Sequence, residues 1–131
     1  MPAVLEPVGP VAPRSEAPTG TVPVVVEFRQ AFGSTLRAEV YWNESKEHVT
    51  LATGDQQLFY VVPGQHEFHA VSRLPFIIET HARVPVVVTA TAPIRIELAA
   101  DARLTGVELR VKVFSGDRRV VDQLFSPLSK R

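Results

Sequence analysis

The chain has 131 residues, no formal net charge at pH 7 and no cysteine. This length accommodates one hydrophobic core of ordinary size together with a tail. Hydrophobic residues make up 45% and charged residues 21% of the chain, which excludes a wholly disordered protein. The zero net charge excludes a global field that would attract nucleic acid or an anionic membrane, and the lack of cysteine excludes disulfides and thiolate metal sites.

Membrane and export signals are also missing from the sequence. No stretch reaches the roughly 18 to 20 consecutive apolar residues that span a bilayer, since Glu79, His81 and Arg83 interrupt the richest region. The first residues, Met1 to Pro7, lack the basic and apolar regions of a secretory signal peptide. We therefore expect cytoplasmic synthesis without membrane insertion, with the final location, including a virion, left open.

The N-terminal residues 1–23 form an arm that is rich in proline. It holds six of the eleven prolines, at positions 2, 7, 10, 13, 18 and 23. Proline at this density disfavours both helix and sheet, so the arm is expected to be extended or polyproline-like. Its apolar side chains, which we expect to contact a neighbouring subunit, are Val4, Leu5, Val8, Val11 and Val22. A disordered leader is the alternative.

Short strand-like stretches follow the arm. Strands are expected over residues 24–29, 36–42, 48–52, 76–80, 83–91, 94–98, 107–114 and 118–125, with a hairpin over 58–70 that turns at Pro63-Gly64. Because Pro85 cannot donate to a ladder, its strand should begin after it or lie at a sheet edge. Residues 99–103 are expected to form a loop.

Alternation of apolar and polar side chains assigns the faces of these strands. The clearest case is 107–114, where the residues expected to face inward are Val107, Leu109, Val111 and Val113. In 36–42 the corresponding residues are Leu36, Ala38, Val40 and Trp42, with Trp42 at the edge of the core. One wet and one buried face is typical of an antiparallel sheet packed on a second layer.

Together these patterns predict an all-β fold. No window of a dozen residues shows helical periodicity with caps, whereas turn signals recur every 8 to 12 residues. We expect an antiparallel β-sandwich of the immunoglobulin-like or transthyretin-like type with an extended Pro-rich N-terminal arm, and a small closed barrel as the second choice. The expected organisation is an arm over 1–23, a sandwich domain over 24–126 and a short tail over 127–131.

The stretch from Val61 to Ala70, with its Pro63-Gly64 turn, and the run Ile94-Arg95-Ile96-Glu97-Leu98 resemble small bacterial sandwich modules of the PEGA and carboxypeptidase-regulatory-like type. The resemblance covers about residues 36–98. Leu74-Pro75-Phe76 stands where such modules usually have Gly-Tyr. These modules are mostly non-catalytic binding or structural appendages, so the resemblance implies no active site and assigns no functional residue.

The residues offer little for catalysis or metal binding. The four histidines are His48, His66, His69 and His81. On a strand, His66 and His69 point to opposite faces and cannot chelate one ion as a pair, although a ligand from His48 or His81 across the sheet could join Glu67 and His69. No nucleophile elbow, phosphate loop or calcium loop occurs, so we expect no enzyme, no metal and no cofactor.

Two functions fit these expectations. The first is a non-catalytic structural subunit of a larger assembly, for example a phage virion decoration or tail component, whose arm binds a neighbouring protein subunit in a homo-oligomer or a mixed assembly. The second is a ligand-binding or adhesion module that recognises glycan or peptide through loops at one end of the sandwich, near 43–47 and 72–76. The candidate surface aromatics are Tyr41, Trp42 and Phe76.

Overall fold

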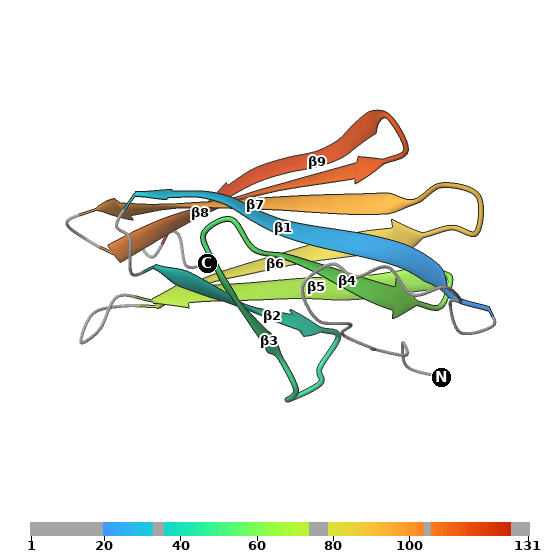
Figure 1. The fold of residues 1–131 in the computed structure, drawn as a ribbon, viewed down its shortest axis with the longest axis horizontal. Helices are drawn as coiled ribbons and strands as arrows, with labels where there is room; N and C mark the ends of the chain where they lie inside the picture. Colours follow the sequence, from blue (N-terminus) through green and yellow to red (C-terminus); the bar gives the residue numbers. More distant parts are fainter. Residues whose placement is uncertain (1–19, 33–35, 74–78, 104–105, 127–131) are drawn as a thin grey trace.

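A computed structural model describes residues 20–32, 36–73, 79–103 and 106–126, and all their regular secondary structure is β-strand (Figure 1). The nine strands are β1 (Val22–Phe32), β2 (Arg37–Trp42), β3 (Val49–Ala52), β4 (Gln56–Val61), β5 (Gly64–Arg73), β6 (Glu79–Val88), β7 (Ile94–Arg103), β8 (Gly106–Ser115) and β9 (Arg118–Phe125). The described residues include no helix that is long and apolar enough to cross a membrane. The expectation of an all-β fold is thus confirmed.

The strands form two sheets that pack together, as in a sandwich, rather than one closed barrel (Figure 1). Sheet A has the order β4-β1-β7-β8-β9, and sheet B has the order β3-β2-β5-β6. The pairing is antiparallel except between β1 and β7, which run parallel with Val24 opposite Ile94. This parallel pair departs from the purely antiparallel expectation, because alternation along a strand does not reveal the direction of its neighbour.

The Pro63-Gly64 turn does not make the expected hairpin. β4 pairs with β1 in sheet A, where Val61 lies opposite Val22, whereas β5 pairs with β2 and β6 in sheet B. The turn therefore carries the chain from one sheet to the other. Gly64 has a backbone φ of 138°, which residues with a side chain rarely adopt. Glycine is therefore needed where the chain crosses between the sheets.

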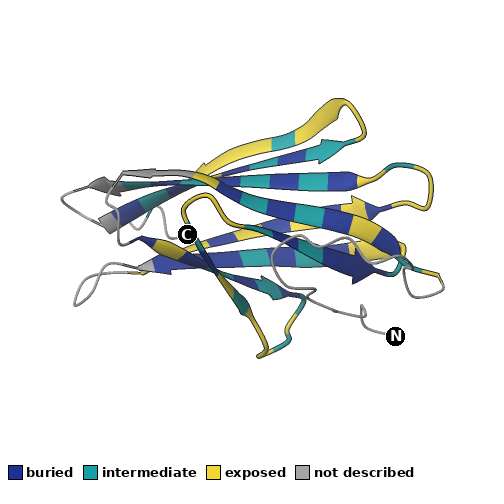
Figure 2. Ribbon diagram, in the orientation of Figure 1, coloured by how far each residue is buried: buried dark blue, intermediate teal, exposed yellow. Residues whose placement is uncertain are grey.

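The core lies between the two sheets and follows the alternation of the sequence (Figure 2). On β8 and β2 the residues expected to face inward are all buried, namely Val107, Leu109, Val111, Val113, Ala38, Val40 and Trp42, as is Leu36 beside β2. Thr80 on β6 is also buried, and its hydroxyl donates to the carbonyl of Val107 on β8. This bond connects the edge of sheet B directly to sheet A.

Several element boundaries differ from the expectation. The strand expected over 24–29 extends over β1, and residues 99–103 continue β7 instead of forming a loop, because Ala100 pairs with both Ala31 and Leu109. Pro85 lies within β6, which is an edge strand of sheet B. An edge strand was one of the two placements expected for this proline. Features expected at 33–34, 74–78 and 127–131 lie outside the described residues.

Candidate functional site

The residues expected to mediate arm contacts divide into two groups. Val4, Leu5, Val8 and Val11 lie outside the described residues, as does Phe76. Val22 belongs to β1, is only 7% exposed and packs into the core. Assigning Val22 to the arm was therefore wrong, because its pairing with Val61 on β4 makes it the first core residue of the domain.

Trp42, expected at the edge of the core and as a surface aromatic, is 1% exposed. The expectation that Trp42 is a surface aromatic is therefore wrong. Its ring meets Phe59 and Phe68 edge-on, with centroid distances of 5.8 and 5.5 Å, and approaches His66 at 6.4 Å. Trp42 thus joins β2 to β4 of the opposite sheet and to β5 of its own. Its indole Nε1–H is buried and has no hydrogen-bond partner among the described residues.

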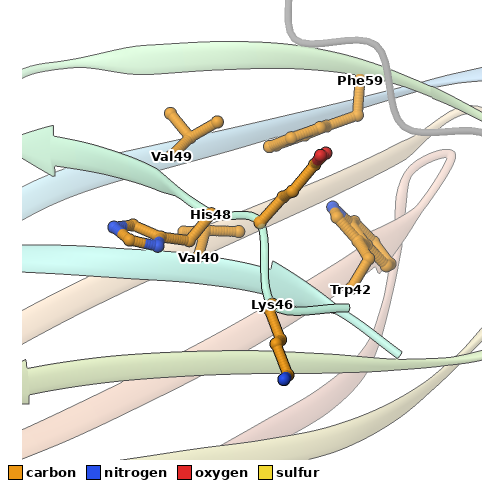
Figure 3. Close-up of a pocket in the computed structure, with 7 residues that line it drawn as sticks. Val40, Trp42, Lys46, His48, Val49 and Phe59 are labelled. Atoms are coloured by element: carbon orange, nitrogen blue, oxygen red, sulfur yellow. The ribbon is translucent and has the colours of Figure 1, made fainter. Parts of the chain in front are cut away.

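A pocket of about 430 Å³ opens over Trp42, at the seam between the edge strands β3 and β4 (Figure 3). The lining residues are Val40, Trp42, Lys46, Glu47, His48, Val49 and Phe59. Figure 3 shows the indole nitrogen of Trp42 on the ring edge that faces into the pocket. The walls are apolar, whereas Lys46, Glu47 and His48 at the rim are exposed and polar.

Asn43 fixes the loop that forms this rim. It has a φ of 57°, a left-handed conformation that asparagine tolerates better than most residues. Its Oδ1 accepts a hydrogen bond from the backbone N–H of Glu67 at 3.0 Å, and its Nδ2 lies 3.2 Å from Nδ1 of His66. His66 Nε2 lies 2.8 Å from the carbonyl of Val62, so the neutral tautomer that carries hydrogen on Nε2 satisfies both contacts.

A row of neighbouring rings, two pairs of which are stacked, crosses the outer face of sheet B. Tyr41, the candidate surface aromatic that does lie on a surface, is the Cα partner of His69 and stacks on it at 5.2 Å. On one side His48 meets Tyr41 at 5.0 Å, and on the other His81 stacks on His69 at 5.1 Å. The row therefore runs from the residue before β3 through β2 and β5 to β6. His66 faces the core, which confirms that His66 and His69 point to opposite faces.

Hydrogen bonds connect the two stacked histidines to each other and to Glu79. His69 Nε2 lies 2.9 Å from His81 Nδ1, and His81 Nε2 lies 2.7 Å from a Glu79 carboxylate oxygen. Burial, with smaller contributions from Arg83 and His81, lowers the pKa of His69 to about 4, although Glu67 acts in the opposite direction. His69 is therefore neutral at pH 7 and can donate to His81, which in turn donates to Glu79.

This row borders a broad groove of about 550 Å³. The groove is lined by the loop residues Asn43, Glu44, Ser45 and Lys46 together with Tyr41, His69, Val71, His81 and Arg83. The loop expected near 43–47 therefore does border a hollow surface, whereas most of its expected companion at 72–76 lies outside the described residues. Rings, amides and charges of both signs in one groove suit a polar ligand with a flat face.

Strand β9 forms an exposed edge of sheet A. It extends past sheet B, and Figure 2 shows most of its length as exposed. Val120 and Leu124 on this strand are 49% and 56% exposed, and the other large exposed hydrophobic residue in the described part of the chain is Val87 on β6. The exposure of β9 was not predicted from the sequence, because the alternation of side chains along one strand carries no information on how far the opposing sheet extends.

Within the described residues, no three His, Asp or Glu side chains come close enough to hold a metal ion together. The two histidines that come together on this face are His69 and His81, a pair that the sequence predicted only as one of several combinations across the sheet. Finding this pair requires the register between β5 and β6, which places His81 opposite Val71 and diagonal to His69.

The chain matches no protein-family model, no curated protein and no solved structure. The resemblance to PEGA-type modules is untested by these comparisons and stays a prediction.

Proposed function

We propose that this chain is a non-catalytic β-sandwich subunit of a larger protein assembly, for example a virion decoration or tail component, and that its N-terminal arm binds a neighbouring subunit. The observation that carries the proposal is the exposed edge at β9. A strand edge with unpaired backbone groups and exposed apolar side chains is a template for pairing with another chain.

The other three edge strands are less suited to this role. β3 has only 4 residues and β4 has 6, whereas β9 has 8. β6 is longer, but Pro85 interrupts its row of donors, and the side chains of Glu79 and Arg83 are exposed. From Val121 to Phe125, β9 has a regular register with β8 and contains no proline, so its free edge can accept a further strand.

A single charge placed on this edge tests the proposal. Leu124→Lys should lower the mass of the assembly in light scattering, because lysine on an edge strand opposes strand addition. Val87→Lys is the matched control, since Val87 is equally exposed but lies on β6. Wild-type protein that stays monomeric at every concentration, alone and with its natural neighbours, would contradict the proposal. A mass unchanged by Leu124→Lys would exclude β9 as the contact.

A second function, a module that binds glycan or peptide, is supported by the groove beside Tyr41 and the loop Asn43 to Lys46. Ring faces and edges in a polar groove are suited to sugar or peptide contacts. Tyr41→Ala should abolish a signal on a glycan or peptide array while leaving the thermal unfolding profile cooperative. A blank array for the wild-type protein rules this function out.

The finer fold type is part of the proposal. We place the sandwich in the immunoglobulin-like or transthyretin-like class, and we keep the likeness to PEGA-type modules as a proposal for residues 36–98. Both are consistent with a binding or structural role without an active site.

A further inference from the structure

We infer that the pocket over Trp42 receives the segment Pro7–Arg14 from the arm of a neighbouring copy. This inference rests on the proposed function, in which the arm binds a neighbouring subunit, and it names the docking site. The first reason is the buried Trp42 Nε1–H, which has no acceptor among the described residues. A buried donor without a partner is unfavourable, so a ligand that brings a carbonyl oxygen into the pocket would be stabilised.

The second reason is the chemistry of the pocket walls. Val40, Val49, Phe59 and Trp42 offer an apolar surface, and the Trp42 donor is buried directly behind it. A polyproline helix presents rings and aliphatic groups together with carbonyl oxygens that have no internal hydrogen bonds. Aromatic grooves recognise such segments because little conformational entropy is lost on binding.

The third reason is the spacing of prolines in the arm. Pro7, Pro10 and Pro13 are three residues apart. Because a polyproline helix has three residues per turn, these prolines share one face. Arg14 follows the last of them, and the exposed carboxylate of Glu47 stands at the rim of the pocket as a partner of opposite charge.

The rim can also give way to a ligand. The side chains of Lys46 and Glu47 make no hydrogen bond or ion pair with the rest of the described chain, so their displacement breaks no polar interaction there. The mouth of the pocket thus combines exposed, unrestrained charges with a buried apolar floor.

The position of the arm favours exchange between two copies. The described chain begins at Gly20, and β1 then pairs Val22 with Val61 and Val24 with Phe59 of the pocket wall. The strand that follows the arm in the sequence therefore borders the wall of the pocket. Two copies can exchange arms reciprocally in an isologous contact. Because the chain has no net charge, no net electrostatic repulsion opposes the association of two copies.

A peptide titration tests the docking site. The receptor is the full chain carrying Pro7→Ser, Pro10→Ser and Pro13→Ser, and the probe is a synthetic peptide of residues 5–15. Trp42 is the sole tryptophan, so its fluorescence reports on the pocket directly. We expect a saturable change with the native peptide and none with a peptide carrying the same three serines. No change, or an equal change with both peptides, would overturn the docking site.

Charge reversal at the rim gives a second measurement that does not depend on altering the core. Glu47→Lys should weaken binding of the peptide about tenfold, because it replaces attraction to Arg14 with repulsion. Glu44→Lys is the matched control, since Glu44 is exposed in the same loop but borders the groove rather than the pocket. Equal affinities for the two variants would argue against contact between Arg14 and Glu47 and so against the docking pose.

A mixing experiment identifies the copy that supplies the arm. One full-length chain carries the three serine substitutions, the other carries Val49→Phe to fill the pocket, and both carry Leu124→Lys to suppress association through β9. Each alone should be monomeric, and their mixture should form a one-to-one dimer in light scattering. A monomeric mixture together with peptide binding would show docking within one chain and overturn the inference. Wild-type assembly that needs Leu124 but not the prolines would overturn the docking site while leaving the assembly itself supported.

Discussion

Asn43 is expected to stabilise the rim of the pocket through two side-chain hydrogen bonds and a left-handed backbone. Asn43→Ala removes the acceptor for Glu67 N–H and the donor to His66, at about 0.5–1.5 kcal/mol each. The φ of 57° adds roughly 1 kcal/mol of strain for alanine. We therefore expect the free energy of unfolding to fall by about 3 kcal/mol. Urea unfolding followed by Trp42 fluorescence measures it, because Trp42 is the neighbouring residue.

Two further substitutions at this position separate the contributions. Asn43→Gly relieves the backbone strain but still loses both hydrogen bonds, so it should cost about 2 kcal/mol. Asn43→Asp keeps the acceptor for Glu67 N–H and tolerates the left-handed conformation, so about 1 kcal/mol is expected. The expected order of stability is Asp above Gly above Ala. Equal losses for Ala and Gly would refute the strain argument, and an Ala variant as stable as the wild type would refute the whole account.

Substitutions of His69 and of two glycines give further measurable effects. The unfolded chain binds a proton at His69 near pH 6.5, but the folded chain does so only near pH 4, so stability should be full above this window and fall as the pH drops through it. The free energy of unfolding should fall by about 1 kcal/mol across this window, given the partial exposure of the ring. Urea unfolding across this pH range measures the decrease, which should be absent in His69→Gln. Gly64→Ala should cost about 1–3 kcal/mol through its φ of 138° alone, since no atom lies within 4 Å of an added Cβ. Gly116→Ala, at a φ of 61°, should cost less in the same urea assay, and the reverse order would contradict the reasoning.

The candidate site could be predicted from the sequence only in part. Tyr41 was placed on a wet face because it alternates with inward residues, and the loop at 43–47 was expected from its polar composition. Trp42 was misjudged as a surface aromatic, since its burial depends on Phe59 and Phe68 from two other strands. The pairing of His69 with His81 and the exposure of β9 depend on register and on sheet width, and neither leaves a local signal.

The sequence by itself determined where most strands form and, where the alternation is clear, which face of the strand is buried. Alternation with period two decides this locally, as in β8, where all four predicted inward residues are buried. Only the tertiary structure decided which strands pair. The signal at Pro63-Gly64 specifies a sharp reversal, but whether the next strand pairs with the previous one or crosses to the other sheet depends on strands far away in the chain. The same holds for the parallel contact of β1 with β7, about seventy residues apart, because hydrogen-bonding groups of the backbone are identical in every strand.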